Sequence, residues 1–171
     1  MDIKKIVRVA VLCAISVVLV WLVHFPLIPG AAFLEYDPAD ICLLITGLSY
    51  GAGWGVLATV VVSLVQGLTV SASSGWIGIL MHILSTSTFV IVTSCVYRKK
   101  GKLALSLVLG ALAMVVVMIP LNLVFTGMFM GAGVKVVVQM LIPAIIPFNA
   151  AKAVINAILS AILYKRIKKL M

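Results

Sequence analysis

Residues 103–129 read LALSLVLGALAMVVVMIPLNLVFTGMF, an apolar run without a charged side chain. A helix of about 20 mainly apolar residues spans the hydrocarbon core of a bilayer. This run is therefore long enough to cross a membrane as a helix. Proline lacks the backbone N–H that the helix ladder needs, so we expect a kink at Pro120.

The rest of the chain has a similar composition. Of its 171 residues, 64% are hydrophobic and 10% are charged, whereas an ordinary soluble domain carries about 25% charged residues. A soluble domain of this length exposes too much surface to hide so many apolar side chains. The composition excludes soluble, disordered, collagen-like and disulfide-rich classes. It predicts an all-α integral membrane protein with a single domain over 1–171.

Prolines, glycines and small polar loops divide the chain into expected helices. Pro38 suits the first turn of a helix, with Asp37 as its N-cap. The stretch GLSYGAGWG at 47–55 predicts a tight hairpin between two helices, and the mixed segment 130–142 leaves room for a short interfacial helix. The six expected spans are approximately 3–25, 38–50, 54–70, 76–97, 103–129 and 143–164.

The basic residues set the expected topology. The chain has 13 Lys and Arg against 4 Asp and Glu, a net charge of +9. In a soluble protein this excess would suggest nucleic acid, but here the bases flank apolar runs, as they do on the cytoplasmic side of membrane proteins. Six spans with both termini in the cytoplasm place every group inside, in contact with anionic lipid and not nucleic acid. The groups are Lys4, Lys5 and Arg8; Arg98, Lys99, Lys100 and Lys102; and Lys165, Arg166, Lys168 and Lys169.

The sequence contains no recognisable catalytic or metal-binding pattern. Its three cysteines are scattered, and HExxH, Cys–His and Ser–His arrangements are missing. It also lacks the GxxxxGK[ST] motif that binds nucleotide phosphates. We therefore predict that the protein is not an enzyme and has no metal site. If it transports actively, its energy must come from partners.

Lys152 is the ionisable residue that lies deepest in an apolar run. It sits roughly 13 Å into the expected helix 143–164, at 1.5 Å per residue, and such groups are costly in a bilayer unless they face a cavity. Asn149 and Asn156 share its helical face. We interpret Asn149 with Lys152 as a ligand site and Asn156 as an interhelical hydrogen-bonding residue. Snorkelling is the alternative for Lys152.

Asn122 follows Pro120 in the outer half of its helix. Its amide can satisfy backbone groups freed by the kink, or it can face the same cavity as Asn149. An amide offers donors and an acceptor and a lysine offers three donors. Together with Lys152, these groups are expected to bind the edge of a flat, heteroatom-rich ring without a formal ion pair.

The acidic residues gather in the first outer loop. Asp37 and Asp40 fit equally well a role in helix capping and loop solvation or a role at the site. Glu35 lies in an otherwise apolar stretch and is harder to explain by solvation. His82, in the expected helix 76–97, is interpreted as a hydrogen-bonded packing residue.

Three features together resemble a known family. Ala10 and Ala14 form an A-x-x-x-A pair, FLEYDPAD occupies 33–40, and GLSYGAGWG follows in a small six-helix chain. This combination resembles the substrate-binding S components of energy-coupling factor (ECF) transporters, and among them the riboflavin-specific RibU family. The resemblance covers nearly the whole chain.

The resemblance implies a function and a set of site residues. Riboflavin, or its phosphate FMN, would be the transported ligand, captured from outside with high affinity, and no cofactor is implied. The partners would be a transmembrane T component, which Ala10 and Ala14 would contact, and two ATP-binding subunits. The location would be a prokaryotic plasma membrane, crossed several times. The implied ligand-binding residues are Leu34, Glu35, Tyr36 and Asp37 in the first-loop lid, and Asn122, Asn149 and Lys152 in the helices.

Two alternatives remain at this point. One is an S component for another vitamin, such as thiamin or biotin. The other is a ligand-free membrane structural protein, which would have a dry interior with Lys152 snorkelling or capped by carbonyl groups. A phosphorylated ligand would meet the acidic loop, with Lys135 as the nearby cation.

Overall fold

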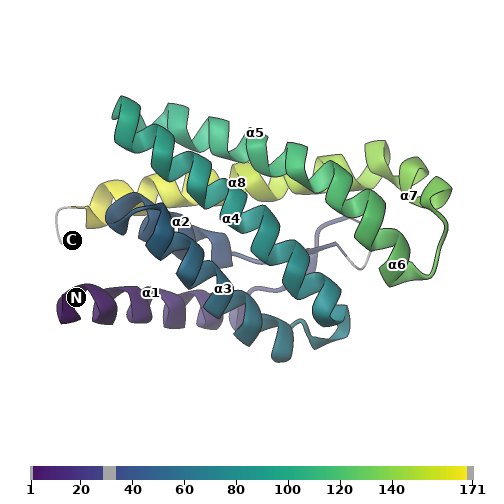
Figure 1. Cartoon of the computed structure of the whole chain (residues 1–171), viewed down its shortest axis with the longest axis horizontal. Helices are drawn as coiled ribbons and strands as arrows, with labels where there is room; N and C mark the ends of the chain where they lie inside the picture. The colour runs from purple at the N-terminus through teal and green to yellow at the C-terminus, as the bar shows by residue number, and fades with distance from the viewer. Residues whose placement is uncertain (1, 29–33, 169–171) are drawn as a thin grey trace.

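The computed structural model describes residues 2–28 and 34–168, nearly all of them helical (Figure 1). Two short strands, β1 (Phe25–Pro26) and β2 (Glu35–Tyr36), lie between the first two helices. A 3₁₀ turn covers Ala72–Ser74, and π-helical turns cover Asn122–Thr126 and Leu141–Ile145. The α-helices are α1 (Ile3–Leu22), α2 (Ala39–Tyr50), α3 (Ala52–Leu68), α4 (Gly75–Lys100), α5 (Leu103–Leu121), α6 (Gly127–Met130), α7 (Val134–Met140) and α8 (Ile146–Ile167).

These elements form six helical rods, which confirms the predicted all-α membrane architecture. Continuous helical stretches over Leu103–Met130 and Val134–Ile167 join α5 to α6 and α7 to α8. Together with α1 and α4, they are long and apolar enough to cross a membrane. The helices α2 and α3 are shorter, at 12 and 17 residues.

The expected start of the last helix at 143 is wrong. Helical backbone begins at Val134, because the segment 130–142 contains the short helix α7, which a π-helical turn joins to α8 in one helical stretch. A π-helical turn over Leu141–Ile145 absorbs Pro143, and Pro147 falls in the first turn of α8, where its missing N–H matters least. The prolines therefore alter the ladder without ending the helix.

Apolar side chains cover the outside of the bundle as well as filling its core. Large apolar side chains face outward along the rods, among them Val108, Leu112, Val116 and Ile158. Hydroxyl and amide side chains lie inside, among them Ser16, Thr59, Thr86, Asn156 and Ser160. Polar groups in a membrane protein face the bundle interior because lipid offers them no hydrogen bonds. The arrangement fits a bundle whose solvent is lipid.

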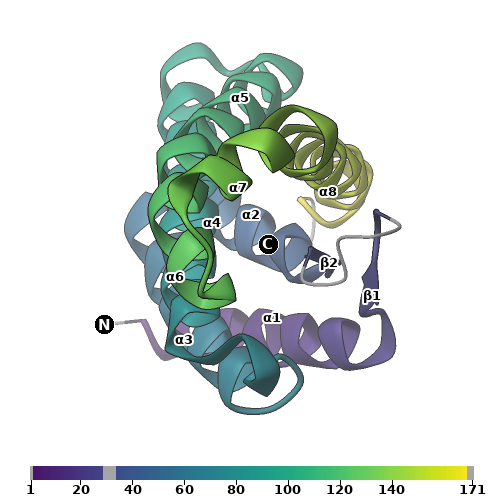
Figure 2. The same cartoon turned by 90° about the vertical axis from the view of Figure 1, so that its right-hand side faces the viewer.

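The short helix α2 lies at the centre of the bundle, with other helices around it (Figure 2). Every residue from Ala39 to Leu48 is buried, which explains why its sequence is apolar on all sides. Gly51 then turns the chain into α3 with a φ of 101°, a conformation that favours glycine. Gly47 and Gly55 pack so closely that a Cβ on Gly55 would meet the Gly47 backbone. The predicted tight hairpin is therefore confirmed.

The basic groups share one end of the bundle. The start of α1, the turn between α4 and α5 and the end of α8 all lie at the left of Figure 1. The expected topology requires this arrangement. Lys169, the last residue of the third group, lies outside the described residues.

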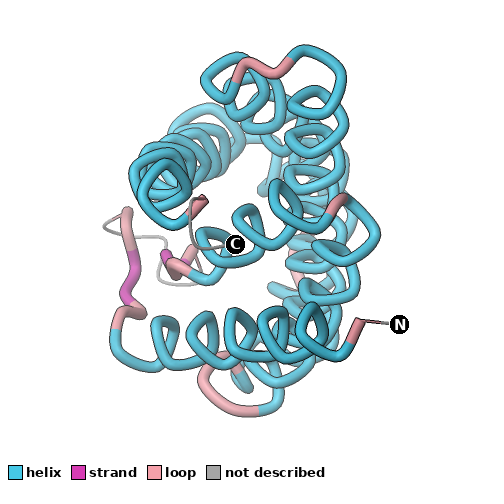
Figure 3. Tube along the Cα trace, turned by 90° about the vertical axis from the view of Figure 1, so that its left-hand side faces the viewer, coloured by secondary structure: helices cyan, strands magenta, loops and turns pink. Residues whose placement is uncertain are grey.

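A two-residue ladder was not predicted from the sequence. Phe25 pairs with Tyr36 and Pro26 with Glu35 in antiparallel register. So short a pairing carries no alternation of apolar and polar residues that a sequence pattern could reveal. Figure 3 shows the strands, in magenta, at the edge between α1 and α8. The ladder anchors the first loop at the end of the bundle away from the basic groups.

Candidate functional site

A cavity of about 250 Å³ lies at that same end of the bundle. Its walls come from α3, α4, α5 and α8, with the first loop beside them. Apolar side chains, including Met114, Met118 and Phe148, make up much of the lining. Most of the residues predicted for the ligand site line this cavity: Leu34, Glu35, Asp37, Asn122, Asn149 and Lys152.

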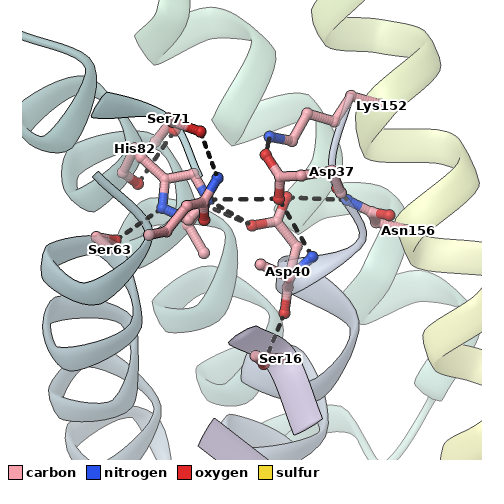
Figure 4. Close-up of polar contacts among 12 residues, drawn as sticks. Ser16, Asp37, Asp40, Ser63, Ser71, His82, Lys152 and Asn156 are labelled. Carbon is pink, nitrogen blue, oxygen red and sulfur yellow. Dashed lines mark hydrogen bonds and ion pairs between the residues drawn. The ribbon is translucent and has the colours of Figure 1, made fainter. Parts of the chain in front are cut away.

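Lys152 is the centre of the polar part of the cavity. Its side chain extends from α8 and is 6% exposed. Its Nζ donates a hydrogen bond to Asp37 Oδ2 over 2.8 Å (Figure 4). No protein partner was predicted for Lys152 from the sequence, but a charge buried this deeply needs one. The same contact excludes snorkelling.

Asp37 joins the first loop to two helices. Its Oδ2 accepts from Lys152, and its Oδ1 accepts from the backbone N–H of Ala39 over 3.2 Å, so it caps α2 as predicted. Burial alone would raise the pKa of the Asp37 carboxyl, but Lys152 and then His82 outweigh burial and hold that pKa below its ordinary value. Asp37 is therefore a carboxylate at neutral pH.

Asp40 is fully buried in the first turn of α2. Its Oδ1 accepts from Thr86 Oγ1 over 2.7 Å, and its Oδ2 accepts from Asn156 Nδ2 over 3.0 Å. These bonds connect α2 to α4 and α8 behind the cavity. Loop solvation, one of the two readings of Asp40, is therefore excluded.

Asn156 and Tyr36 form the inner side of this network. Tyr36 Oη donates to Asn156 Oδ1 over 2.9 Å, and Asn156 Nδ2 donates to Asp40. The interhelical role predicted for Asn156 is confirmed. Tyr36, predicted as a ligand residue, is buried against Asn156 and is not among the residues that line the cavity. A ligand contact by Tyr36 finds no support in this geometry.

Asn122 and Asn149 use their amides in the same way. Asn122 Nδ2 donates to the Met118 carbonyl over 2.7 Å, and Asn149 Nδ2 donates to the Ile145 carbonyl over 2.8 Å. Asn122 lines the cavity, as the second reading expected, but its amide bonds the Met118 carbonyl and not the Val116 carbonyl that Pro120 leaves without its helix partner. Its Oδ1 accepts from Thr126, whereas Asn149 Oδ1 has no hydrogen-bond partner within residues 2–28 and 34–168.

The sequence interpretation missed several polar residues of the cavity. Ser63 and Gln66 of α3 and His82 of α4 line it. His82 Nδ1 lies 2.7 Å from Ser63 Oγ, so His82 is hydrogen-bonded as predicted, but it also faces the cavity. Its Nε2 lies 3.5 Å from Asp40 Oδ1. Gln66 could have been found by the reasoning applied to Asn122, because it too is an amide within an apolar run.

His24 and Glu35 meet at the base of the first loop. His24 Nε2 lies 2.8 Å from Glu35 Oε2, and both residues line the cavity. The β1–β2 pairing brings them together across the base of the first loop. Glu35 is therefore at the edge of the cavity, as expected for a lid residue.

Ala10 and Ala14 lie outside the cavity. Both are exposed on the outward face of α1, next to the exposed side chains of Val7, Val11 and Val18. Small residues four apart let another helix approach closely. This face of α1 is open to a partner helix.

The described part of the chain holds no group of His, Cys, Asp or Glu residues suited to a metal ion. What remains is an amphipathic cavity in a membrane bundle, with a fixed ammonium group and amide groups at one side. A family model described as the substrate-specific component of ECF transporters matches residues 4–164. The chain belongs to this family.

Named relatives of this S component are bacterial transporters. The riboflavin transporter FmnP of Bacillus subtilis is 27% identical, over 98% of this chain and 94% of the relative. The riboflavin transporter RibU of Lactococcus lactis is 25% identical, over 97% and 94%. A solved structure of the S component of a bacterial ECF transporter superimposes with a TM-score of 0.84 at 26% identity, covering 98% of this chain and 96% of that one.

The family assignment confirms the resemblance seen in the sequence. This S component is a multi-pass protein of a prokaryotic cell membrane, and its relatives are transporters by name. Assignment to a transporter family and the cavity together overturn the alternative of a ligand-free structural protein. The ligand contacts of individual residues remain predictions.

Proposed function

We propose that this S component binds riboflavin at the outer face of the membrane and delivers it inward as part of an ECF importer. The observation that carries the proposal is the cavity that collects Asn122, Asn149 and Lys152 in one place. Relatives named riboflavin transporters cover nearly the whole chain, which supports a flavin as the ligand.

The cavity offers groups that suit a flavin ring. The ring of riboflavin is flat, with apolar faces and an edge that carries carbonyl oxygens, ring nitrogens and an N–H. Met114, Met118 and Phe148 supply apolar surface for the faces. Asn149 Oδ1 is a free acceptor for the N–H, and Lys152 has three donors, of which Asp37 takes one.

The Asp37–Lys152 pair fixes the position of the ammonium group before the ligand arrives. A lysine side chain is flexible, and ordering it on binding weakens affinity. Here Asp37 holds Nζ at 2.8 Å, so the ligand meets a donor that is already in place. This preorganisation supports tight binding.

Active transport needs a source of energy, which must come from partner subunits. It carries no GxxxxGK[ST] sequence, so we propose that two ATP-binding subunits supply the energy and that a T component couples them to this chain. The exposed pair Ala10 and Ala14 on α1 is the proposed contact for the T component. Riboflavin is then a cargo and not a cofactor, and the protein performs no catalysis.

The absorption spectrum of the purified protein tests the proposal. We expect bound flavin to colour the protein yellow, and riboflavin added to ligand-free protein to lose fluorescence on binding. Thiamin and biotin should not compete. A titration without quenching, or displacement of flavin by thiamin or biotin, would refute riboflavin as the ligand and favour an S component for another vitamin.

A further inference from the structure

The cavity has a second polar wall that the flavin ring does not explain. It is formed by α3, α4 and the turn between them, and Figure 4 shows Ser63, Ser71 and His82 on the opposite side of Asp37 and Asp40 from Lys152. Its polar residues are Ser63, Gln66, Ser71, Ser73, Ser74, His82 and Ser85, and α4 adds the apolar side chains of Ile77, Ile79 and Met81. Arg and Lys are absent from the lining here, since Lys152 on α8 is the one such residue among the described lining residues.

Gln66 is the residue of this wall that most requires an explanation. Its side chain is 6% exposed, and its Nε2 makes a long hydrogen bond of 3.5 Å to Ser71 Oγ. Its Oε1 is buried and has no hydrogen-bond partner among the described residues. A buried polar atom without a partner destabilises a fold, so such an atom in a cavity wall is typical of a ligand contact.

His82 extends the same wall. Ser63 Oγ lies 2.7 Å from its Nδ1, and its Nε2 faces two carboxylates, 3.5 Å from Asp40 Oδ1 and 3.9 Å from Asp37 Oδ1. Ser71 lies beside Gln66 at the outer end of the wall, where its backbone carbonyl accepts from Ser74 Oγ. Hydroxyl, amide and imidazole groups thus follow one another from the interior of the cavity to the 71–74 turn.

The chemistry of this wall selects a neutral, hydroxyl-rich group. Hydroxyl and amide side chains both donate and accept, as the hydroxyls of a polyol do. Lys and Arg, which bind phosphate most strongly, are absent from the described lining residues of this wall, and the start of α4 at its outer end is the one feature there that attracts an anion. A flat ring would need broad apolar surface, which Met114, Met118 and Phe148 provide elsewhere.

We propose that Gln66, with Ser71 and His82, binds the hydroxylated chain of the ligand, while the α5 and α8 side of the cavity binds its ring. The assignment rests on the proposed function, because riboflavin carries a chain of hydroxyls on its ring. It makes Gln66 a determinant of specificity that separates riboflavin from flavins lacking the chain.

Comparing riboflavin with lumiflavin tests the contact between Gln66 and the hydroxylated chain. Lumiflavin has the ring of riboflavin with a methyl group in place of the hydroxylated chain. The affinities of both flavins are measured by fluorescence quenching for the unaltered protein, for Gln66→Met and for Gln139→Met. Gln139 is the other glutamine of the chain and is exposed on α7, so it controls for the chemical change alone.

We expect Gln66→Met to weaken riboflavin binding about tenfold, as the loss of one buried hydrogen bond does, and to leave lumiflavin binding unchanged. Gln139→Met should change neither. An equal loss for both flavins in Gln66→Met, or no loss for either, overturns the assignment of this wall. If Gln66→Met binds neither flavin, the smaller change Gln66→Asn replaces it under the same criteria.

Flavin binding by the unaltered protein distinguishes a failure of the proposed function from a failure of the wall assignment. If it binds neither flavin, the proposed function fails, and the wall assignment fails with it. If it binds riboflavin and lumiflavin equally tightly, the chain contributes nothing to affinity. In that case the wall assignment alone fails and the proposed function stands.

Discussion

Lys152 Nζ lies 2.8 Å from Asp37 Oδ2, and both side chains are buried where α8 meets the first loop. The two residues are 115 positions apart in the chain. The contact joins the loop at the edge of the cavity to the helix that carries Asn149. One ion pair therefore holds together two parts of the proposed ligand site.

Removing one member of this pair should weaken the fold as well as ligand binding. Lys152→Met leaves the Asp37 carboxylate buried without its partner, which typically destabilises a protein by about 3–5 kcal/mol. We expect a lower midpoint of thermal unfolding in detergent and weaker flavin binding. The double variant Lys152→Met with Asp37→Asn should recover stability but not affinity. Recovery of both would show that Lys152 does not contact the ligand.

The substitution Tyr36→Phe tests whether Tyr36 stabilises the fold or contacts the ligand. The change removes the hydrogen bond from Tyr36 Oη to Asn156 Oδ1 and should destabilise the fold by about 1 kcal/mol. Riboflavin affinity should not change, because Tyr36 is not in the cavity lining. Thermal unfolding and a flavin titration on the same sample measure both. Lost affinity at unchanged stability would restore the contact that the resemblance implied.

FMN should bind more weakly than riboflavin. The cavity edge carries the carboxylate of Glu35, and Lys152 is already engaged by Asp37. Lys135, the cation expected nearby, is exposed on α7 and is not in the cavity lining. We expect FMN to bind about tenfold more weakly, equivalent to about 1.4 kcal/mol of repulsion. Competition titrations should show that Glu35→Gln reduces the difference between the affinities for riboflavin and FMN. Equal affinities for the two ligands in the unaltered protein would contradict this prediction.

A bulky residue on α1 should separate flavin binding from transport. Ala14 is exposed, so Ala14→Trp should leave stability and flavin affinity nearly unchanged. It should prevent the close helix approach that small residues allow and abolish copurification with the T component. Ala104→Trp, at an exposed alanine on α5, is the matched control. If both variants assemble equally well, Ala14 is not in the interface.

The membrane bundle and half of the site were predictable because charge is scarce in this sequence. Lys152 stood out in an apolar run, and Asn149 followed from its place on the same helical face. The partner of Lys152 was not predictable, because Asp37 lies in a loop and helical spacing says nothing about contacts between a loop and a distant helix. Asp37 was expected either as a helix cap or as a site residue, and it caps α2 as well as binding Lys152.

The second wall was missed for a different reason. His82 was interpreted as a hydrogen-bonded packing residue, and its bond to Ser63 confirms that part, but a single histidine in an apolar helix does not indicate which surface it faces. Gln66 was not considered, although it is an amide within an apolar run. Only the packing of α3 against α4 brings Gln66, Ser71 and His82 to one surface.

The central position of α2 has a consequence for the route of the ligand. All its residues from Ala39 to Leu48 are buried, and Asp40 ties it to α4 and α8 on the side of the cavity. The helix α2 lies on the axis along which a pore through the bundle would run. A ligand bound in the outer cavity therefore has no straight path along this axis between the described helices.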